Sequence, residues 1–248
     1  MSNKSDNLRK VLQQMKNGRN HPDGYNPVWN QYTVSYDEQK RNILDILCEK
    51  YGSDKGYCEY TGQHVFPWNP HNYTDHYHEL FGHCRQYIQN VLECGLGTNN
   101  TQFKSNMTET GMPGASLRIW RDYFPIANIV GLDIDGSVLF TEERIQTYQC
   151  DQTDTQQVFD TLYNLDRQFD IIIDDGLHEF EAGFLFFHVA SKFLTPNGVY
   201  IIEDVKEHDF RTYKKILGSN DKYFVKFIEL ERDDEQVHDN NLIVIRKK

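Results

Sequence analysis

The sequence has few cysteines, and their number and spacing argue against the structures that cysteines most often build. There are five, an odd number, and no two of them follow the Cys-x-x-Cys spacing of zinc and redox motifs. We therefore expect free thiols in a reducing, cytoplasmic setting, without a disulfide framework or a zinc site. The five cysteines are Cys48, Cys58, Cys84, Cys94 and Cys150.

Positive charge and long apolar runs are also scarce. The 26 lysines and arginines are outnumbered by 37 acids, the formal net charge is −11, and no basic stripe is visible. This balance argues against nucleic acid or an anionic membrane surface as a partner. Residues 1–16 lack the apolar segment of a secretory signal, and the longest apolar stretch, Ala182 to Leu194, is too short to cross a bilayer. We expect a cytoplasmic protein without membrane insertion.

The remaining composition is that of a folded protein with two regions of different character. Of the 248 residues, 38% are hydrophobic and 13% aromatic, which is enough to bury a core. Residues 1–85 combine irregular segments rich in Asn, Pro, Tyr and Gly with two predicted helices, Asp37–Lys50 and Tyr73–Gln89. We interpret residues 1–85 as a helical and irregular N-terminal cap and lid, and residues 86–248 as the main domain.

The main domain alternates short apolar strands with helical segments, which predicts an α/β fold. We expect a mostly parallel seven-stranded sheet that ends in an antiparallel hairpin. The predicted strands are Asn90–Cys94, Asn128–Leu132, Thr147–Cys150, Phe169–Ile173, Val199–Ile202, Tyr223–Glu229 and Asn241–Arg246. The predicted helices lie near Ala115–Tyr123, Ser137–Ile145, Thr155–Leu165, Glu179–Phe193 and Asp209–Leu217. Pro and Asn-Gly predict a turn at Thr195–Gly198.

Glycines and acids follow the first three strands at positions where a nucleoside would bind. Gly95 and Gly97 come directly after the first strand and let the backbone approach a ligand closely. Asp133 closes the second strand, where a carboxylate would bind ribose hydroxyls. Asp151 closes the third, near the place of an adenine ring. The pattern predicts a nucleoside-containing cofactor at this end of the sheet.

A dinucleotide is the obvious competing cofactor, but the pattern does not favour it. Its fingerprint requires a third glycine, and Asn100 stands at that position. A polar segment, Thr98–Pro113, also separates the glycines from the next helix. This arrangement suits an adenosyl ligand without a pyrophosphate, so we favour S-adenosylmethionine over NAD.

Two later strands end in acids. Asp174 and Asp175 close one strand, with His178 three residues on, and Glu203 and Asp204 close the next. The carboxyl ends of parallel strands meet at one edge of a sheet, so these groups would share a crevice. Because neighbouring residues on a strand face opposite sides, we expect Asp175 in the crevice and interpret Asp174 as a helix N-cap.

The acids and the histidine suit metal-assisted chemistry. Oxygens from Asp175, Glu203 and Asp204 would suit Mg²⁺ or Mn²⁺. Such an ion acidifies a bound hydroxyl, and an imidazole can take its proton. His178 is the candidate base, and its reference pKa of about 6.5 predicts a largely neutral ring at physiological pH.

On these residues the chain resembles the metal-dependent macrocin/mycinamicin-type sugar O-methyltransferases. The resemblance runs from about residue 51 to residue 205, and DDGxH followed by IED is its specific part. The shared motifs are YGSDKG (51–56), the aromatic segment 73–77, VLECGLG, GASLRIWRDYFP (114–125), IVGLDID, FDIIIDDGLH and VYIIEDV. The resemblance implies the Rossmann-like class I methyltransferase fold, S-adenosylmethionine as methyl donor and a Mg²⁺-type ion.

The resemblance also implies roles for individual residues. Asp175, Glu203 and Asp204 correspond to metal ligands, and His178 corresponds to the base, so the catalytic pair is His178 and Asp175. The expected cofactor-binding residues are Lys55, Tyr73, Tyr77, Glu93, Gly95, Gly97, Ser116, Asp133 and Asp151. Leu177, where the family usually has a small polar residue, and the longer Thr98–Pro113 loop are departures that would reshape the acceptor pocket.

The predicted function is methyl transfer from S-adenosylmethionine to a sugar hydroxyl. The acceptor would be a nucleotide-activated sugar, a glycan or a glycoside, and we expect a role in surface-polysaccharide biosynthesis. Three alternatives stay open at this point: a catechol-type acceptor, a natural-product acceptor, and a non-catalytic module that binds S-adenosylmethionine. Residues 1–85 would either cap the site or pack against a second subunit, so a homo-oligomer is compatible with the sequence.

Overall fold

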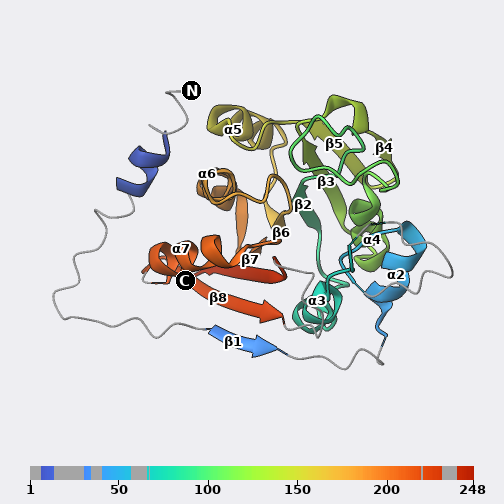
Figure 1. The fold of residues 1–248 in the computed structure, drawn as a ribbon, viewed down its shortest axis with the longest axis horizontal. Coiled ribbons are helices and arrows are strands. Elements are labelled where there is room, and N and C mark those ends of the chain that lie inside the picture. The colour runs from blue at the N-terminus through green and yellow to red at the C-terminus, as the bar shows by residue number, and fades with distance from the viewer. Residues whose placement is uncertain are drawn as a thin grey trace.

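One mixed sheet organises the part of the chain that the structure describes. The computed structural model describes residues 7–13, 31–34, 41–56, 66, 68–218, 220–230 and 239–248. Its nine strands have the order β1-β8-β9-β7-β6-β2-β3-β5-β4 (Figure 1). The strands are β1 (Gln31–Val34), β2 (Asn90–Cys94), β3 (Asn128–Asp133), β4 (Thr141–Glu142), β5 (Ile145–Gln149), β6 (Phe169–Asp174), β7 (Leu194–Ile202), β8 (Tyr223–Leu230) and β9 (Asn241–Lys247). The helices are α2 (Ile43–Tyr51), α3 (Tyr73–Phe81), α4 (Ala115–Tyr123), α5 (Thr155–Asn164), α6 (Phe180–Ala190) and α7 (Glu207–Leu217), with 3₁₀ turns η1 (Gly136–Val138) and η2 (Ser191–Phe193).

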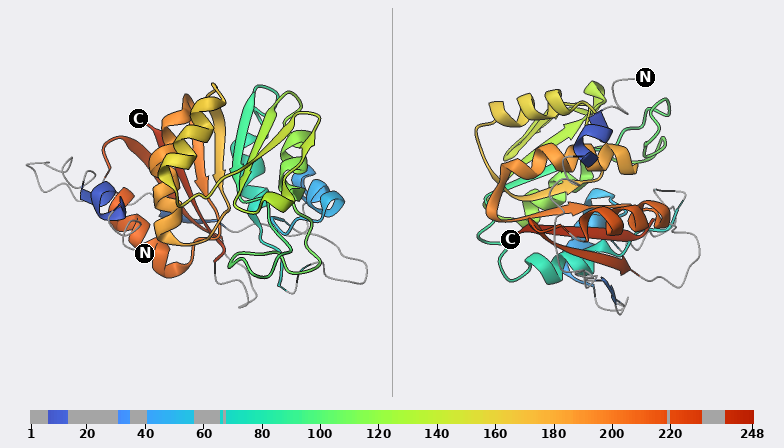
Figure 2. Two further views of the ribbon diagram at one scale, coloured as in Figure 1. Left: turned by 90° about the horizontal axis from the view of Figure 1, so that it is seen from above. Right: turned by 90° about the vertical axis from the view of Figure 1, so that its left-hand side faces the viewer.

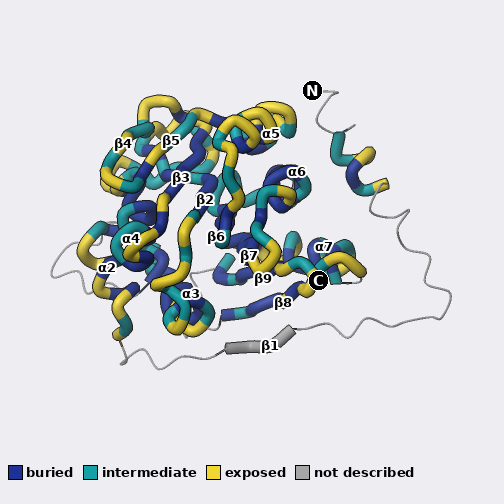
Figure 3. Tube along the Cα trace, turned by 180° about the vertical axis from the view of Figure 1, so that it is seen from behind, coloured by how far each residue is buried: buried dark blue, intermediate teal, exposed yellow. Residues whose placement is uncertain are grey.

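Helices cover both faces of the sheet and make three layers (Figure 2). Successive residues of a strand enter opposite cores, as the alternation of strand side chains requires. Leu92 and Ile172 pack on the face covered by α5, α6 and α7. Val91 and Ile171 pack on the face covered by α2, α3 and α4. The central strands are therefore buried on both sides, and Figure 3 shows their trace mostly in the buried colour.

The strand directions place a switch point beside β2. The pairs β2–β3, β2–β6, β3–β5, β6–β7 and β1–β8 are parallel, whereas β7–β9, β8–β9 and β4–β5 are antiparallel. The chain builds outward from β2 through β3 to β5 and then returns to the other side of β2 with β6 and β7. Ligands collect outside such a reversal. The predicted mostly parallel sheet with a C-terminal antiparallel pair is confirmed, with β1 and β4 as additional strands.

The predicted helix at Ser137–Ile145 is wrong. This segment forms η1, then β4, and then the start of β5. Asp135 caps η1 through the backbone N–H of Ser137, and the Thr147 hydroxyl bonds both backbone groups of Phe140. Ile145 pairs with Ile129 of β3. Hydrogen bonds to a neighbouring strand thus outweigh the helical preference of an eight- to ten-residue segment, which is weak in isolation.

Several other predicted elements differ from the observed ones, two helices and a turn most clearly. Helix α2 begins at Ile43, where Asn42 and Asp45 form a capping box, and residues 37–40 lie outside the described part of the chain. Helix α3 ends at Phe81, before Gly82, instead of continuing to residue 89. The turn predicted at Thr195–Gly198 lies inside β7, where the pairing with β6 jumps between Phe169–Leu194 and Ile171–Val199. The turn residues therefore form a bulge in the strand.

Two expectations from composition can be compared with the described residues. Within the described ranges Cys48, Cys84, Cys94 and Cys150 take part in no disulfide, in line with the prediction, and Cys58 lies outside these ranges. Among the helices of the described ranges, none combines the length and the apolar content that a membrane crossing requires.

Candidate active site

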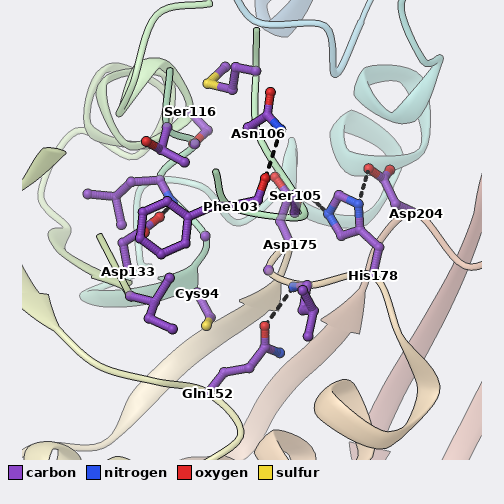
Figure 4. Close-up of a pocket in the computed structure, with 18 of the residues that line it drawn as sticks. Cys94, Phe103, Ser105, Asn106, Ser116, Asp133, Gln152, Asp175, His178 and Asp204 are labelled. Atoms are coloured by element: carbon purple, nitrogen blue, oxygen red, sulfur yellow. Dashed lines mark hydrogen bonds and ion pairs between the residues drawn. The ribbon is translucent and has the colours of Figure 1, made fainter. Parts of the chain in front are cut away.

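A cavity of about 420 Å³ lies at the carboxyl ends of the central strands. The segments that follow β2, β3, β5, β6 and β7 all contribute to its lining. Figure 4 shows Ser116 and Asp133 at one end of this cavity and Asp175, His178 and Asp204 at the other. Its volume falls within the range of small-molecule sites. The fold thus brings the predicted cofactor end and the predicted acidic end into one space.

Most of the predicted site residues line the cavity, and four lie behind it. Those that line it are Lys55, Gly95, Gly97, Ser116, Asp133, Asp151, Asp175, His178 and Asp204. Those behind it are Tyr73, Tyr77, Glu93 and Glu203, all with at most 2% of their surface exposed. Their positions match a supporting role for the residues in front of them.

The glycine turn after β2 is built around the acids of its neighbours. Gly95 has φ +98°, and a Cβ there would lie 1.9 Å from the carbonyl oxygen of Asp175, so the position requires glycine. The Asp133 carboxylate accepts hydrogen bonds from the backbone N–H of Leu96, at 2.7 Å, and of Asp135, at 2.8 Å. Each oxygen keeps a second lone pair, which leaves Asp133 able to accept from ligand hydroxyls.

At the other end of the cavity, His178 lies between two carboxylates. Its Nε2 is 3.1 Å from Asp175 Oδ1, and its Nδ1 is 3.5 Å from Asp204 Oδ2. His178 and Asp204 both have left-handed backbones, with φ of +56° and +52°. Such conformations cost about 1–3 kcal/mol each in a residue other than glycine and concentrate at functional sites. The fold holds both side chains in place against this cost.

The charge state of His178 differs from the expected neutral ring. Burial disfavours the imidazolium, but Asp204 and Asp175 outweigh burial and raise the pKa of His178 to about 10. Without a further cation, the ring therefore carries a proton at neutral pH. It can serve as a base only when the negative charge around it is neutralised.

Lys55 supplies a cation next to the histidine site. Its Nζ lies 2.6 Å from Asp175 Oδ2 and 3.4 Å from Glu93 Oε1, and it also bonds Glu203. Burial disfavours the ammonium, but the three carboxylates hold the pKa of Lys55 well above its ordinary value. The Tyr77 hydroxyl donates to the same Glu203. Lys55 thus ties the loop after α2 to the tips of β2, β6 and β7.

The donor set fits a hard divalent cation. Ligand atoms of Asp175, His178 and Asp204 all lie within 4.8 Å of one another. Carboxylate oxygens are the ligands that Mg²⁺ and Mn²⁺ prefer, so Asp175 and Asp204 are the residues that would hold the ion. Glu203, the third predicted ligand, faces Lys55 and Tyr77 instead. Its role as a ligand stays a prediction.

The interpretation of Asp174 as a helix cap is wrong. Glu179 occupies the N-cap position of α6. Asp174 is buried, accepts a hydrogen bond from Gln152 Nε2 at 3.0 Å, and has the Tyr200 hydroxyl 3.5 Å away. Burial raises the pKa of Asp174 to about 6. Asp175, by contrast, lines the cavity, as the alternation along the strand predicts.

The Thr98–Pro113 segment forms an ordered wall of the cavity. Met107 fills the space beside Gly97 and Gly111, and its backbone N–H donates to the carbonyl of Thr98. Phe103 of this wall lines the cavity, and Lys104 forms an ion pair with Glu179. The segment is therefore part of the binding surface.

Among the cavity residues that the sequence did not single out, one histidine and one glutamine side chain contact the acids. His71 and Gln152 both line the cavity, the latter with its side chain bonded to Asp174 and to the backbone N–H of Leu177. His71 precedes α3 in a stretch without periodicity, and Gln152 is one of several glutamines in its region. No sequence signal separates either residue from its neighbours.

Known proteins with similar sequences are sugar O-methyltransferases. The chain is 35% identical over 141 residues to mycinamicin VI 2''-O-methyltransferase of Micromonospora griseorubida, covering 54% of this chain and 32% of that protein. It is 34% identical over 149 residues to demethylmacrocin O-methyltransferase of Streptomyces fradiae, covering 59% of this chain and 35% of that protein. A 2'-O-methyltransferase of Streptomyces olivaceus that acts on 8-demethyl-8-alpha-L-rhamnosyl tetracenomycin-C is 28% identical over 189 residues, 74% of this chain and 43% of that protein.

Solved structures show the same fold. MycE methyltransferase from the mycinamycin biosynthetic pathway, in complex with Mg and SAH, superposes with a TM-score of 0.56 at 22% identity, covering 84% of this chain and 55% of that one. No protein-family model matches the chain. The chain spans less than half the length of the three relatives given above. The predicted resemblance is thus confirmed: the chain has the Rossmann-like class I methyltransferase fold and is similar in sequence to macrocin- and mycinamicin-type sugar O-methyltransferases.

Proposed function

We propose that this protein transfers a methyl group from S-adenosylmethionine to a sugar hydroxyl with the help of Mg²⁺ or Mn²⁺. The observation that carries the proposal is the cavity that joins Gly95 and Asp133 to Asp175, His178 and Asp204. A nucleoside site and a cation site in one space are what a metal-assisted methyl transfer requires. Relatives named as sugar O-methyltransferases, and a structural neighbour solved with Mg and SAH, support the same function.

In this reaction the acceptor oxygen forms a bond to the methyl carbon, the carbon–sulfur bond of the donor breaks, and the hydroxyl proton leaves. Asp175 and Asp204 would hold a divalent ion, which would supply positive charge next to the acceptor hydroxyl and lower the pKa of that hydroxyl. With those carboxylates neutralised, the pKa of His178 falls from about 10 towards its ordinary value, because the carboxylates are what raise it. His178 then accepts the proton at one of its ring nitrogens. Asp133 accepts hydrogen bonds from the ribose hydroxyls of S-adenosylmethionine and thereby positions the methyl donor.

The acceptor is best sought among glycosides. The relatives are named for methylation of mycinamicin VI, demethylmacrocin and a rhamnosyl tetracenomycin, which are natural products. The expected surface-polysaccharide setting has no counterpart among these relatives, so we favour a natural-product glycoside over a polysaccharide sugar. A nucleotide-activated sugar stays in the proposal, because it presents the same hydroxyls.

We also propose that residues 1–85 act as a cap and lid for the domain formed by residues 86–248. Lys55, Tyr73 and Tyr77 support this division, since they reach from the first segment to the acids of β6 and β7. Strand β1 of the same segment pairs with β8, which anchors the cap to the sheet.

The test is a methyl-transfer assay read by mass spectrometry. The purified protein is incubated with S-adenosylmethionine, Mg²⁺ or Mn²⁺, and a panel of p-nitrophenyl glycosides, nucleotide sugars and catechol. We expect a mass gain of one methyl group on a sugar and none in EDTA. Transfer to catechol alone would contradict the sugar assignment. Calorimetry that shows donor binding without transfer to any acceptor would identify a non-catalytic module, and activity undiminished in EDTA would exclude the metal mechanism.

A further inference from the structure

A second histidine flanks the same carboxylate as His178. His71 Nε2 lies 3.5 Å from Asp204 Oδ1, whereas His178 approaches Oδ2 of the same group. His71 is 7% exposed and lines the cavity. Its ring is held in a stack with Tyr73, with centroids 4.5 Å apart and an interplanar angle of 15°. The acid end of the cavity therefore presents two fixed imidazoles, one on each side of Asp204.

Hydrogen bonds behind the ring decide which nitrogen of His71 faces the cavity. Asn240 donates from Nδ2 to the carbonyl of Leu230 at 2.7 Å and to Asn72 Oδ1 at 2.8 Å. A backbone carbonyl only accepts, so this contact fixes the amide orientation of Asn240. Its Oδ1 then accepts from His71 Nδ1, at 3.1 Å. Nδ1 carries the hydrogen, and Nε2 is the acceptor nitrogen of the neutral ring.

Nε2 of His71 has no short protein partner among the described residues. Its 3.5 Å separation from Asp204 Oδ1 is longer than a normal hydrogen bond. That oxygen already accepts from the Tyr73 hydroxyl at 2.7 Å. His71 lines the cavity, so its Nε2 is available to a hydroxyl or a water molecule there. The geometry suits a ligand hydroxyl close to the one that Asp204 and His178 would handle.

We propose that His71 Nε2 forms a hydrogen bond with a second hydroxyl of the acceptor, next to the hydroxyl that is methylated. The proposal rests on the sugar O-methyltransferase function proposed above and narrows its substrate class to sugars with two neighbouring free hydroxyls. Two imidazoles that flank the two oxygens of one carboxylate can each bond one of two adjacent sugar hydroxyls. Trp68, whose indole N–H donates to Asp54 at 2.7 Å, also lines the cavity.

Two substitutions separate this role from a structural one. His71→Asn keeps an N–H at the position of Nδ1 and its bond to Asn240, but it removes the cavity-facing nitrogen. His71→Gln places its amide near the position of Nε2 and gives up the bond to Asn240. His208→Asn is the matched control, because the His208 side chain is 88% exposed on α7 and does not line the cavity.

The assay compares the best glycoside of the panel with its analogue that lacks the neighbouring hydroxyl. With the diol, we expect His71→Asn to lower kcat/KM about tenfold, the effect of one hydrogen bond, and His71→Gln to lose less. With the deoxy analogue, the wild-type protein and His71→Asn should be equal. The affinity for S-adenosylhomocysteine and the melting temperature of both His71 variants are measured in parallel. Both quantities should equal those of the His208→Asn control.

The outcomes distinguish this inference from the proposed function. A larger loss in His71→Gln than in His71→Asn, or equal losses with the diol and the deoxy analogue, would show that His71 only supports Asn240. The sugar O-methyltransferase function would then stand without a His71 subsite. A wild-type protein that methylates no sugar would overturn both.

Discussion

Replacing Lys55 with methionine tests how the acidic end of the site is stabilised. The Lys55 side chain is 5% exposed and forms ion pairs with Asp175, Glu203 and Glu93. Removing one partner of a buried ion pair typically costs about 3–5 kcal/mol, because the remaining charges stay buried without compensation. With three carboxylates on one ammonium, we expect Lys55→Met to lower the free energy of unfolding by about 4 kcal/mol. Lys55→Arg, which keeps the charge, should lose less than half of that.

The measurement is urea unfolding followed by circular dichroism, with and without millimolar Mg²⁺. Lys104→Met is the matched control, since the Lys104 and Glu179 side chains of its ion pair are 72% and 40% exposed. Exposed pairs contribute about 0–1 kcal/mol, so this variant should unfold close to the wild-type midpoint. Mg²⁺ should restore more stability to Lys55→Met than to the wild type, because it replaces a lost cation. Equal losses in the two lysine variants would refute the reasoning.

Three further predictions concern pH, proton transfer and donor binding. Burial lowers the pKa of His76 from 6.5 to about 4, so the unfolded chain takes up a proton in this range and the folded protein does not. The free energy of unfolding should therefore fall by about 3 kcal/mol as the pH drops from 6.5 to 4, at about 1.4 kcal/mol per pH unit. Urea unfolding of His76→Phe at the same pH values should not show this decrease. His178→Ala should lower kcat by about 10²- to 10⁴-fold while calorimetry shows unchanged binding of S-adenosylhomocysteine; lost binding would point to a structural role. Asp133→Ala should weaken that binding by about 10- to 100-fold, and an unchanged Kd would remove Asp133 from the donor site.

The strands that position the site were predictable because local and global preferences agree in them. Phe169–Asp174 and Val199–Ile202 are β-branched, apolar runs, and the sheet buries them on both faces. Their acidic ends identified the edge at which the cavity lies. Ser137–Ile145 was not predictable in this way, because its pairing depends on β3, a partner outside the segment.

The side-chain contacts of the site were less predictable than its location. Lys55 was predicted to bind the cofactor and does line the cavity, but its contacts with the acids were not foreseen, and Asp175 lies 120 residues further along the chain. His71 reaches Asp204 only through the packing of the segment before α3 and of Asn240 before β9. Such contacts depend on how distant segments pack, and no spacing within the sequence encodes them.

The position of β9 has a consequence for how the protein is made. This strand, Asn241–Lys247, follows β8 in the sequence, yet it lies inside the sheet between β7 and β8. During synthesis, β8 can join the sheet only after the residues of β9 have emerged from the ribosome. Strand β1 pairs with β8, so it can join the sheet only after β8 has done so, although it precedes β8 in the sequence. Asn240, which orients His71, arrives at the same late moment. A nascent chain that stops before residue 240 would therefore have most of the nucleoside side of its cavity and an unfinished acceptor side.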